Sequence, residues 1–386
     1  MARRAAQPRN AAQGRAAGES AQITRKPINH RARPLAKAPG PRYQARREGS
    51  PQSAMKAILL TRTGDPSVLE YVELPTPCPQ PGEVLVKAHT IGVSRPELMV
   101  RQGTYPWMPP LPAIPGIEMS GTVVECGRGV SMLAAGDAVY ISARELPQRT
   151  GCYAEYIAVP ERVPFRLPPG ADLEAAACLS NYQVAYHLLH TAGRGLPGQT
   201  VLIDGAAGGI GSAAVQLAKL AGMTAIGRVG TAEKARALSA FGADHVIDTG
   251  REPVEARVRA ITAGAGVDLI LDATGGRAFA RNFALLAPFG MVVSYGKLEG
   301  PLEDSVVAAL ERGPGYLNST GVRVFTMHTL DDKPALRAQS MQRLIAYLAE
   351  GAIRPLIHAR LPLREASRAH GMLEARAVIG KVLLKP

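Results

Sequence analysis

The segment whose residue types point most directly to chemistry is a glycine-rich turn. An apolar run, VLID (201–204), leads into GAAGGIG (205–211), and an amphipathic stretch of helix length follows. Glycines at these spacings allow a tight turn, a close approach of the backbone to a pyrophosphate, and close packing of helix against strand. The N–H groups and the dipole at the start of the helix then favour phosphate. The pattern predicts a dinucleotide-binding site that includes Gly205, Gly208, Gly209, Ile210 and Gly211.

The residues after this turn favour a phosphorylated dinucleotide. A site for NAD commonly places an acid roughly 20 residues beyond the glycines, where it binds the ribose hydroxyls. No Asp or Glu lies between Gly211 and Glu233, whereas the next apolar run ends at Arg228 and Lys234 follows. Two cations suit a 2′-phosphate with almost two negative charges. We therefore expect NADPH, and the alternative is a pair of solvated surface cations.

Cysteine and histidine spacing does not indicate metal chemistry. Cys78, Cys126, Cys152 and Cys178 are far apart and form no CxxC pair. The histidines after residue 54 show no HxxxH or HExxH spacing, so we interpret each as structural. Neither a zinc knuckle nor a disulfide framework is predicted, and without a secretory signal a reducing cytoplasm is the expected location.

Two patterns of apolar residues predict the domains that must position these residues. From 55 to 178, short apolar runs are broken by Gly and Pro, which is typical of a compact barrel-like β domain. The runs are MKAILL (55–60), LEYVELP (69–75), EVLVKAHTIGV (83–93), SGTVVECG (120–127), DAVYIS (137–142) and YAEYIAV (153–159).

From 179 to 323, strand-length apolar runs alternate with amphipathic stretches, which predicts a doubly wound parallel sheet with helices on both faces. Residues 324–386 contain a helical pattern around 342–350 and a last strand, and are expected to return to the β domain. The strands are TVLIDG (200–205), TAIGRV (224–229), DHVIDT (244–249), VDLILDA (267–273) and GMVVSYG (290–296); the helices are SAAVQLAKLAG (212–222), TAEKARALSAFG (231–242), EPVEARVRAIT (252–262) and RAFARNFALLAP (277–288).

Length and composition agree with this organisation. The 386 residues, 46% hydrophobic and 20% charged, indicate a globular protein of two or three domains. No apolar run approaches the roughly 18 residues of a membrane span, so we expect none. The net charge of +13 is concentrated in residues 1–54, where 12 Lys and Arg accompany only Glu19 and Glu48, leaving +3 for the rest.

The basic segment 1–54 is rich in Ala, Arg, Gln, Pro and Gly and lacks hydrophobic periodicity, so we expect it to be disordered. Three interpretations stay open: a basic arm for nucleic acid or acidic surfaces, an Arg-rich transit peptide, and upstream sequence translated in error. The third is favoured because MKAILL, beginning at Met55, has the pattern of a natural start.

Several motifs together carry a family resemblance. They are GVSRPELMVRQGTYP (92–106), IPGIEMSGTVVECGRGVSMLAAGDAVY (114–140), YAEYIAVP (153–160), NYQVAYHLL (181–189), VLIDGAAGGIGSAAVQLAK (201–219), TAEKARALSAFGADHVID (231–248) and IGKVLL (379–384). With these motifs, residues 55–386 resemble the zinc-free quinone oxidoreductase (zeta-crystallin-like) branch of the medium-chain dehydrogenase/reductases. The resemblance implies a GroES-like β domain, a Rossmann nucleotide domain inserted in it, an active site between them, and a homodimer.

The zinc-dependent alcohol dehydrogenases of that superfamily provide a negative test. Their metal is held by a Cys in a GVC pattern, a His in a GHE pattern, and a further Cys six residues before a helical Tyr. Here the three positions are Ser94, Ile117 and Ser180. Serine and isoleucine cannot replace thiolate and imidazole as zinc ligands, so we expect no metal and no alcohol oxidation as the main activity. Glu118 remains, and we interpret it as structural.

A proton donor is suggested by the same resemblance. Tyr105 is similar in position to the QGxYP tyrosine of the mitochondrial-type enoyl reductases, for which proton donation is implied. A phenol with an unperturbed pKa near 10 stays protonated at neutral pH and can donate a proton in the transition state. The alternative is a tyrosine that only packs beside Pro106 and Trp107.

The resemblance also suggests residues around the nicotinamide and the acceptor. Ser94 stands where quinone oxidoreductases usually carry Asn, and its hydroxyl is a candidate hydrogen-bond donor to a substrate carbonyl. Asn181 or Tyr182 is expected to border the nicotinamide, and Gly296 to let the strand end approach the ring. Lys381 is expected to be a surface cation rather than a phosphate partner.

We therefore predict an NADPH-dependent, zinc-independent oxidoreductase that transfers a hydride to a quinone or an α,β-unsaturated carbonyl. A 2-enoyl thioester reductase is a close alternative. From another class, an RNA-binding protein would use the basic arm, but no RNA-recognition signature is present and aromatics are only 5% of the chain. The expected partner is a small electrophilic acceptor, with no membrane or nucleic acid.

Overall fold

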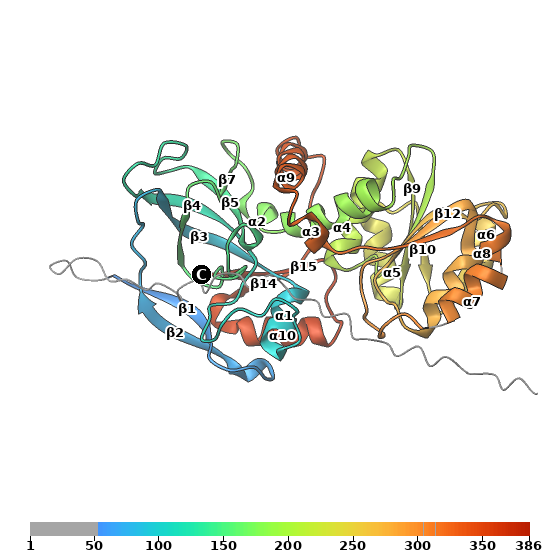
Figure 1. Ribbon diagram of the computed structural model, residues 1–386, viewed down its shortest axis with the longest axis horizontal. Coiled ribbons are helices and arrows are strands. Elements are labelled where there is room, and N and C mark those ends of the chain that lie inside the picture. The colour runs from blue at the N-terminus through green and yellow to red at the C-terminus, as the bar shows by residue number, and fades with distance from the viewer. Residues whose placement is uncertain (1–52, 304, 313) are drawn as a thin grey trace, which may run out of the picture. The chain divides into compact units, whose positions relative to one another are not determined.

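A computed structural model gives the fold and describes residues 53–303, 305–312 and 314–386. Most of the basic segment, up to residue 52, lies outside the described residues. The disorder expected of that segment therefore stays a prediction. The described chain is built around two large sheets and one small one (Figure 1). None of its helices is long and apolar enough to cross a bilayer.

The larger sheet has seven strands, in the order β14-β15-β3-β4-β5-β7 with β6 also paired to β3. Its pairs are antiparallel except β14 with β15. A separate antiparallel pair, β1 and β2, is bridged to this unit at Ala57 with Ala154. The strands are β1 (Ala54–Leu60), β2 (Leu69–Pro75), β3 (Glu83–Val93), β4 (Glu118–Cys126), β5 (Ala138–Ser142), β6 (Tyr156–Pro160), β7 (Phe165–Arg166), β14 (Ile357–Pro362) and β15 (Lys381–Lys385).

The second sheet is parallel, with six strands in the order β10-β9-β8-β11-β12-β13. If β8 is counted as strand 1, this order is 3-2-1-4-5-6, which is the doubly wound order. In such sheets ligands bind where the direction of winding changes, and here that point lies between β8 and β11. All five predicted strands are present, and a sixth, β13, was not predicted. The strands are β8 (Thr200–Asp204), β9 (Thr224–Val229), β10 (His245–Asp248), β11 (Val267–Asp272), β12 (Leu286–Ser294) and β13 (Gly321–Val324).

Three of the four predicted helices of this region form, and the fourth does not. They are α4 (Gly209–Leu220), α5 (Ala232–Phe241) and α6 (Val254–Ile261). The stretch 277–288 was predicted as one helix, but it is a 3-10 helix, η4 (Arg277–Leu285), followed directly by β12. Phe279 and Phe283 are buried, and Leu286 pairs with Val267, so the chain must become extended there. The short helices α7 (Ser305–Arg312) and α8 (Pro314–Leu317) were also not predicted.

The C-terminal segment adds strands to the seven-stranded sheet, because β15 pairs with β3 and β14 with β15. Its long helix, α9 (Pro334–Ala349), begins eight residues before the predicted pattern, with proline in the first turn where it is tolerated. We keep the division into 55–178, 179–323 and 324–386 as a proposal. The other helices are α1 (Arg95–Gln102), α2 (Leu173–Ala176), α3 (Leu179–Tyr186), which continues into a π-helical turn (His187–Ala192), and α10 (Ala366–Glu374).

Candidate active site

The turn between β8 and α4 has a backbone that only glycine allows at two positions. Gly205 has a φ of 59°, in the left-handed region. A Cβ on Gly211 would overlap the Gly205 carbonyl and the Ala206 Cα, so glycine is needed where α4 packs on the strand. Gly208 caps α4 and has no side chain to bond its first N–H groups, which leaves them for a phosphate. Half-buried Ile210 follows in the first turn.

Arg228 lies at the end of β9, as predicted, but its charge is directed inward. Its guanidinium donates to Oδ2 of Asp204, its register partner on β8, and to Oδ1 of Asn282 at 3.4 Å. Asp204 is 1% exposed, and burial raises its pKa to about 7 while Arg228 opposes the rise. Arg228 thus compensates a buried carboxyl group, and a 2′-phosphate would compete with Asp204 for it. Sequence reasoning missed this partner.

The polar contacts continue from β8 to β11, the two neighbouring strands between which the direction of winding changes. Asp272 ends β11 and accepts hydrogen bonds from Asn282 Nδ2 at 3.0 Å, from the backbone of Gly275 at 2.8 Å and from Thr274. Asn282 therefore links Arg228 to Asp272. These buried groups fix the carboxyl ends of the central strands.

Lys234 has a different partner from Arg228. It lies in the first turn of α5, whose cap, Thr231, accepts from the Lys234 backbone at 3.3 Å. Its Nζ donates to the carbonyl of Arg376 at 2.7 Å. Exposed Arg376, which sequence reasoning missed, in turn donates to the carbonyl of Leu298 at 2.9 Å. Two cationic residues therefore meet at this point.

Asn181 and Tyr182, from helix α3, point in different directions. A Cβ on Gly209 would overlap Nδ2 of Asn181, so the amide lies directly against the start of α4. The Tyr182 hydroxyl instead donates to Oε1 of Gln216, farther along α4, at 2.7 Å. Of the two alternatives, Asn181 is the one beside the glycine turn.

Gly296 and Gly380 bring two further segments to the same region. A Cβ on Gly296 would overlap the carbonyl of Ala273, so the end of β12 lies close to the end of β11. Gly380, directly before β15, donates its N–H to the carbonyl of Ala207 in the glycine turn at 2.7 Å. The nucleotide turn is thereby joined to a strand of the other sheet.

Lys381 is not a surface cation, so that prediction was wrong. It is 3% exposed, and its Nζ lies 2.5 Å from both Glu118 Oε1 and Ser94 Oγ. The Glu118 carboxylate also accepts from the backbone of Ser180 at 3.0 Å and from the Tyr140 hydroxyl at 3.3 Å. A buried carboxylate of this kind needs a cation, and Lys381 supplies it. Ser94 therefore contacts an ion pair.

This ion pair lies among the positions that hold zinc in the alcohol dehydrogenases. Ser94 and Ser180 both contact Glu118, and Ile117 precedes it in the chain. Across the described ranges, no three or more His, Cys, Asp or Glu side chains are grouped to hold a metal ion. The donor set around Glu118 is hydroxyl, ammonium and amide, which does not suit zinc.

Glu97 is a second buried acid that sequence reasoning missed. It is 1% exposed, and burial raises its pKa to about 8, against the opposing charge of Lys381. Its Oε1 accepts from the Ile117 backbone at 3.3 Å. Burial therefore favours the protonated form of Glu97, and the acid in contact with Lys381 Nζ is Glu118.

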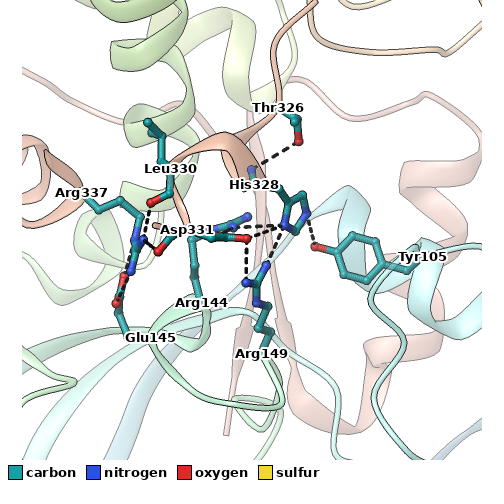
Figure 2. A network of polar contacts seen from close by, with 9 residues as sticks. All are labelled: Tyr105, Arg144, Glu145, Arg149, Thr326, His328, Leu330, Asp331 and Arg337. Carbon is teal, nitrogen blue, oxygen red and sulfur yellow. Dashed lines mark hydrogen bonds and ion pairs between the residues drawn. The ribbon is translucent and has the colours of Figure 1, made fainter. Parts of the chain in front are cut away.

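Tyr105 lies in a polar network built from three separate segments (Figure 2). It follows α1, while Arg149 follows β5 and His328 and Asp331 lie between β13 and α9. Tyr105 Oη is 3.2 Å from His328 Nε2, and His328 Nδ1 is 2.7 Å from Arg149 Nη1. Asp331 Oδ1 accepts from Arg144 at 2.8 Å, and Asp331 Oδ2 accepts from Arg149 at 2.7 Å.

The network continues to an ion pair that holds the segment before α9. Arg337 donates two hydrogen bonds to Glu145, of 2.8 and 2.7 Å, in a bidentate pair. It also donates to the carbonyls of Leu330 at 2.5 Å and Asp331 at 3.0 Å (Figure 2). The backbone around His328 is therefore fixed to the loop after β5.

The surroundings of Tyr105 keep its phenol protonated. Burial raises its pKa above the usual 10, and Arg144 and Arg149 oppose the rise. Trp107 lies 5.8 Å from the Tyr105 ring and stacks on His328, with ring centroids 3.2 Å apart and planes at 16°. Tyr105 thus both packs beside Trp107 and contacts a titratable partner, and the arrangement can donate a proton.

Comparisons with known proteins cover both sheets. The alcohol dehydrogenase GroES-like domain family matches residues 80–169, and the zinc-binding dehydrogenase family matches residues 241–384. The quinone oxidoreductase of Pseudomonas aeruginosa is 33% identical over 333 residues, 86% of this chain and 99% of that protein. The human synaptic vesicle membrane protein VAT-1 homolog is 32% identical over 347 residues, 86% of each protein.

A solved structure supports the same relationship. The Escherichia coli quinone oxidoreductase complexed with NADPH has a TM-score of 0.74 and 29% identity, covering 86% of this chain and all of that one. The expected combination of a GroES-like domain and a Rossmann-type parallel sheet is confirmed. The chain belongs to the medium-chain dehydrogenase/reductase superfamily, in the branch of the quinone oxidoreductases and VAT-1 proteins.

Proposed function

We propose that this oxidoreductase oxidises NADPH and reduces a quinone or an α,β-unsaturated carbonyl without zinc. The single observation that carries the proposal is the glycine turn, where the first N–H groups of α4 have no side-chain cap and so suit a phosphate. Tyr105, whose pKa is raised by burial, supports an acceptor that needs a proton. The relative from Escherichia coli was solved with NADPH, which supports the same cofactor here. A 2-enoyl thioester remains the close alternative acceptor.

The residues fit a dinucleotide. We assign the pyrophosphate to the N–H groups of Gly209, Ile210 and Gly211, because Gly208 caps α4 without a side chain that could bond to them. The 2′-phosphate is assigned to Lys234 and Arg228, the second only in competition with Asp204. Such charge-assisted contacts are worth roughly 1.5–3 kcal/mol each.

On the acceptor side we assign roles to Asn181, Gly296, Tyr105 and Ser94. Asn181 and Gly296 border the nicotinamide, and NADPH bound there supplies a hydride. Tyr105 gives the proton that an enolate needs. Ser94 is a weaker candidate than Tyr105 for a donor to the acceptor oxygen, because its hydroxyl already contacts Lys381 and Glu118.

A screen of NADPH oxidation tests the proposal directly. Quinones, enones, enals and acyl thioesters are supplied one at a time, with NADH in place of NADPH and with EDTA as controls. We expect turnover with at least one of these acceptors, a preference for NADPH and no effect of EDTA. No turnover with any of them, or loss of activity in EDTA, contradicts the proposal.

Tyr105→Phe then separates the acceptor classes. A reduced quinone is protonated by solvent, whereas an enolate gains roughly 10² to 10⁴ in rate from a positioned acid. The variant should therefore lose enone or enoyl turnover by about that factor and keep quinone turnover. Equal losses on both acceptors remove the distinction and argue that Tyr105 only packs.

We also propose that the chain forms a homodimer through β13. This strand is at the edge of the parallel sheet, and large apolar side chains nearby are exposed: Phe289 by 84%, Leu317 by 82% and Val324 by 68%. An exposed apolar edge strand tends to pair with another chain. Light scattering after gel filtration should give twice the chain mass, and Val324→Lys should give the monomer; a monomeric parent protein refutes the dimer.

A further inference from the structure

His328 lies between Tyr105 and two arginines, and its place in the fold is fixed from several sides. Its Nε2 faces Tyr105 Oη at 3.2 Å (Figure 2). The indole of Trp107 stacks on its ring. Its backbone N–H donates to Thr326 Oγ1 at 3.4 Å. Only 12% of its side chain is exposed.

Three contacts at Nδ1 decide which nitrogen of His328 carries the proton. Arg149 Nη1 lies 2.7 Å from Nδ1, Asp331 Oδ2 lies 3.2 Å from it, and Arg144 Nη1 lies 3.5 Å from it. A guanidinium can only donate, so the shortest contact requires a lone pair on Nδ1. Asp331 Oδ2 is satisfied by the other nitrogen of Arg149, at 2.7 Å. A neutral ring with its lone pair on Nδ1 carries its hydrogen on Nε2.

The electrostatic surroundings favour the neutral ring. Burial lowers the pKa of His328 to about 4, and the charge of Arg144 acts in the same direction, against Asp331. Arg149 itself has a φ of 53°, a left-handed backbone uncommon outside glycine and often found at functional sites. With this backbone conformation, the Arg149 side chain reaches Nδ1.

This tautomer has a direct consequence for Tyr105. With hydrogen on Nε2, His328 donates to the phenolic oxygen, which then accepts. The single phenolic hydrogen is not used in that contact and is free to point toward an acceptor. The same N–H stabilises the phenolate that remains after the proton leaves, as do the nearby charges of Arg144 and Arg149.

We propose that His328 is a positioning residue that donates from Nε2 to Tyr105 and so directs the phenolic proton to the acceptor, an inference that rests on the proposed function. As hydride reaches the β-carbon, the Tyr105 O–H bond breaks and the proton joins the enolate. NADPH is oxidised and the carbon–carbon double bond is reduced. The phenolate, held by the Nε2 hydrogen, then takes a proton from water.

Substitutions at His328 test this role with an internal control. His328→Leu removes the donor, and His328→Gln keeps an N–H near the position of Nε2. We expect His328→Leu to lower kcat for the enone about tenfold or more while quinone turnover and the KM for NADPH change less than about twofold. His328→Gln should recover part of the loss. His245→Leu, at the half-buried histidine that begins β10, is the matched control and should change neither activity.

The double variant shows whether His328 acts through Tyr105. In a Tyr105→Phe background, His328→Leu should cause no further loss, because the group it positions is gone. Equal losses on enone and quinone, or a further loss in the double variant, overturn the role of His328 alone. Enone turnover that survives Tyr105→Phe overturns both this inference and the assignment of Tyr105.

A measurement on the unaltered protein covers the case in which the variants fail to fold. Nitrogen-15 imidazole shifts of His328 at pH 7 should show a protonated Nε2 and an unprotonated Nδ1, and Arg149→Leu should weaken that preference. A ring protonated on Nδ1, or on both nitrogens, overturns the inference.

Discussion

The nucleotide side and the acceptor side of this protein are built in different ways. The nucleotide side depends on the backbone of one turn, in which seven consecutive residues supply the bend, the close approach and the N–H groups. The acceptor side depends on side chains from separate segments, and Tyr105 is 223 positions from His328. A local site is visible as a motif, whereas a site made of distant side chains has no motif.

The two sides also treat buried charge differently. On the nucleotide side, Arg228 is shared between a buried acid and the expected phosphate. Around Ser94, the charges of Lys381 and Glu118 are enclosed together, and hydroxyl and backbone amide groups bond to the Glu118 carboxylate. We infer that the first arrangement can exchange partners, whereas the second is fixed. Each of the following substitutions tests one part of this comparison.

The largest effect is expected from breaking the enclosed ion pair. Lys381→Met leaves the Glu118 carboxylate buried without a cation, which typically costs about 3–5 kcal/mol. The free energy of unfolding, measured with urea, should fall by that amount. Arg368→Met is the control, because its pair with Glu365 is exposed and worth roughly 0–1 kcal/mol. Equal small effects of the two substitutions would mean that the buried pair does not stabilise the fold.

A smaller effect is expected at the glycine turn. In Gly211→Ala the new Cβ meets the Gly205 carbonyl, and overpacking of this kind costs about 1–3 kcal/mol. Because the strained backbone is the phosphate site, calorimetry should show the Kd for NADPH rising about 5- to 150-fold. Gly371→Ala is the matched control, since its Cβ would enter open space within α10. An unchanged Kd in Gly211→Ala would place the pyrophosphate elsewhere.

The same contrast explains what could be predicted from the sequence. The alternation of apolar runs predicted five of the six parallel strands, and the glycine spacing predicted the turn, because both patterns are local. Neither pattern revealed that Lys381 is buried, because its partner Glu118 is 263 positions away in the sequence. Residues 277–288 have a helical spacing of apolar side chains, with Phe279 four residues before Phe283, but pairing with β11 ends the helix early.

Arg228 is an intermediate case, because a signal for its partner was present. Asp204 ends the first strand of the parallel sheet and Arg228 lies one residue before the end of the second, and the two are in register. Adjacent parallel strands place such residues side by side, so the strand order alone would have suggested the pair. The acid that binds the ribose in an NAD site lies beyond the glycines, whereas Asp204 precedes them.

The smallest effect is expected from removing this competitor. In Asp204→Asn the carboxylate that holds Arg228 is gone, so the guanidinium is free for the 2′-phosphate and NADPH should bind about 3- to 10-fold more tightly. Affinity for NADH, which lacks that phosphate, should be unchanged. Tightening of both cofactors by the same factor would instead indicate a general rearrangement of the turn.

Asp204 should also make stability depend on pH, and the same substitution tests it. In the unfolded chain its carboxyl group loses its proton near 3.8, whereas in the fold it keeps it up to about 7. The folded state therefore binds more protons between these values, and its stability falls as the pH rises from about 4 to about 7. Asp204→Asn should flatten this part of the profile in urea titrations. A parent protein whose stability does not fall over this range would mean that Arg228 already holds Asp204 ionised, and its carboxylate would then compete most strongly with the 2′-phosphate.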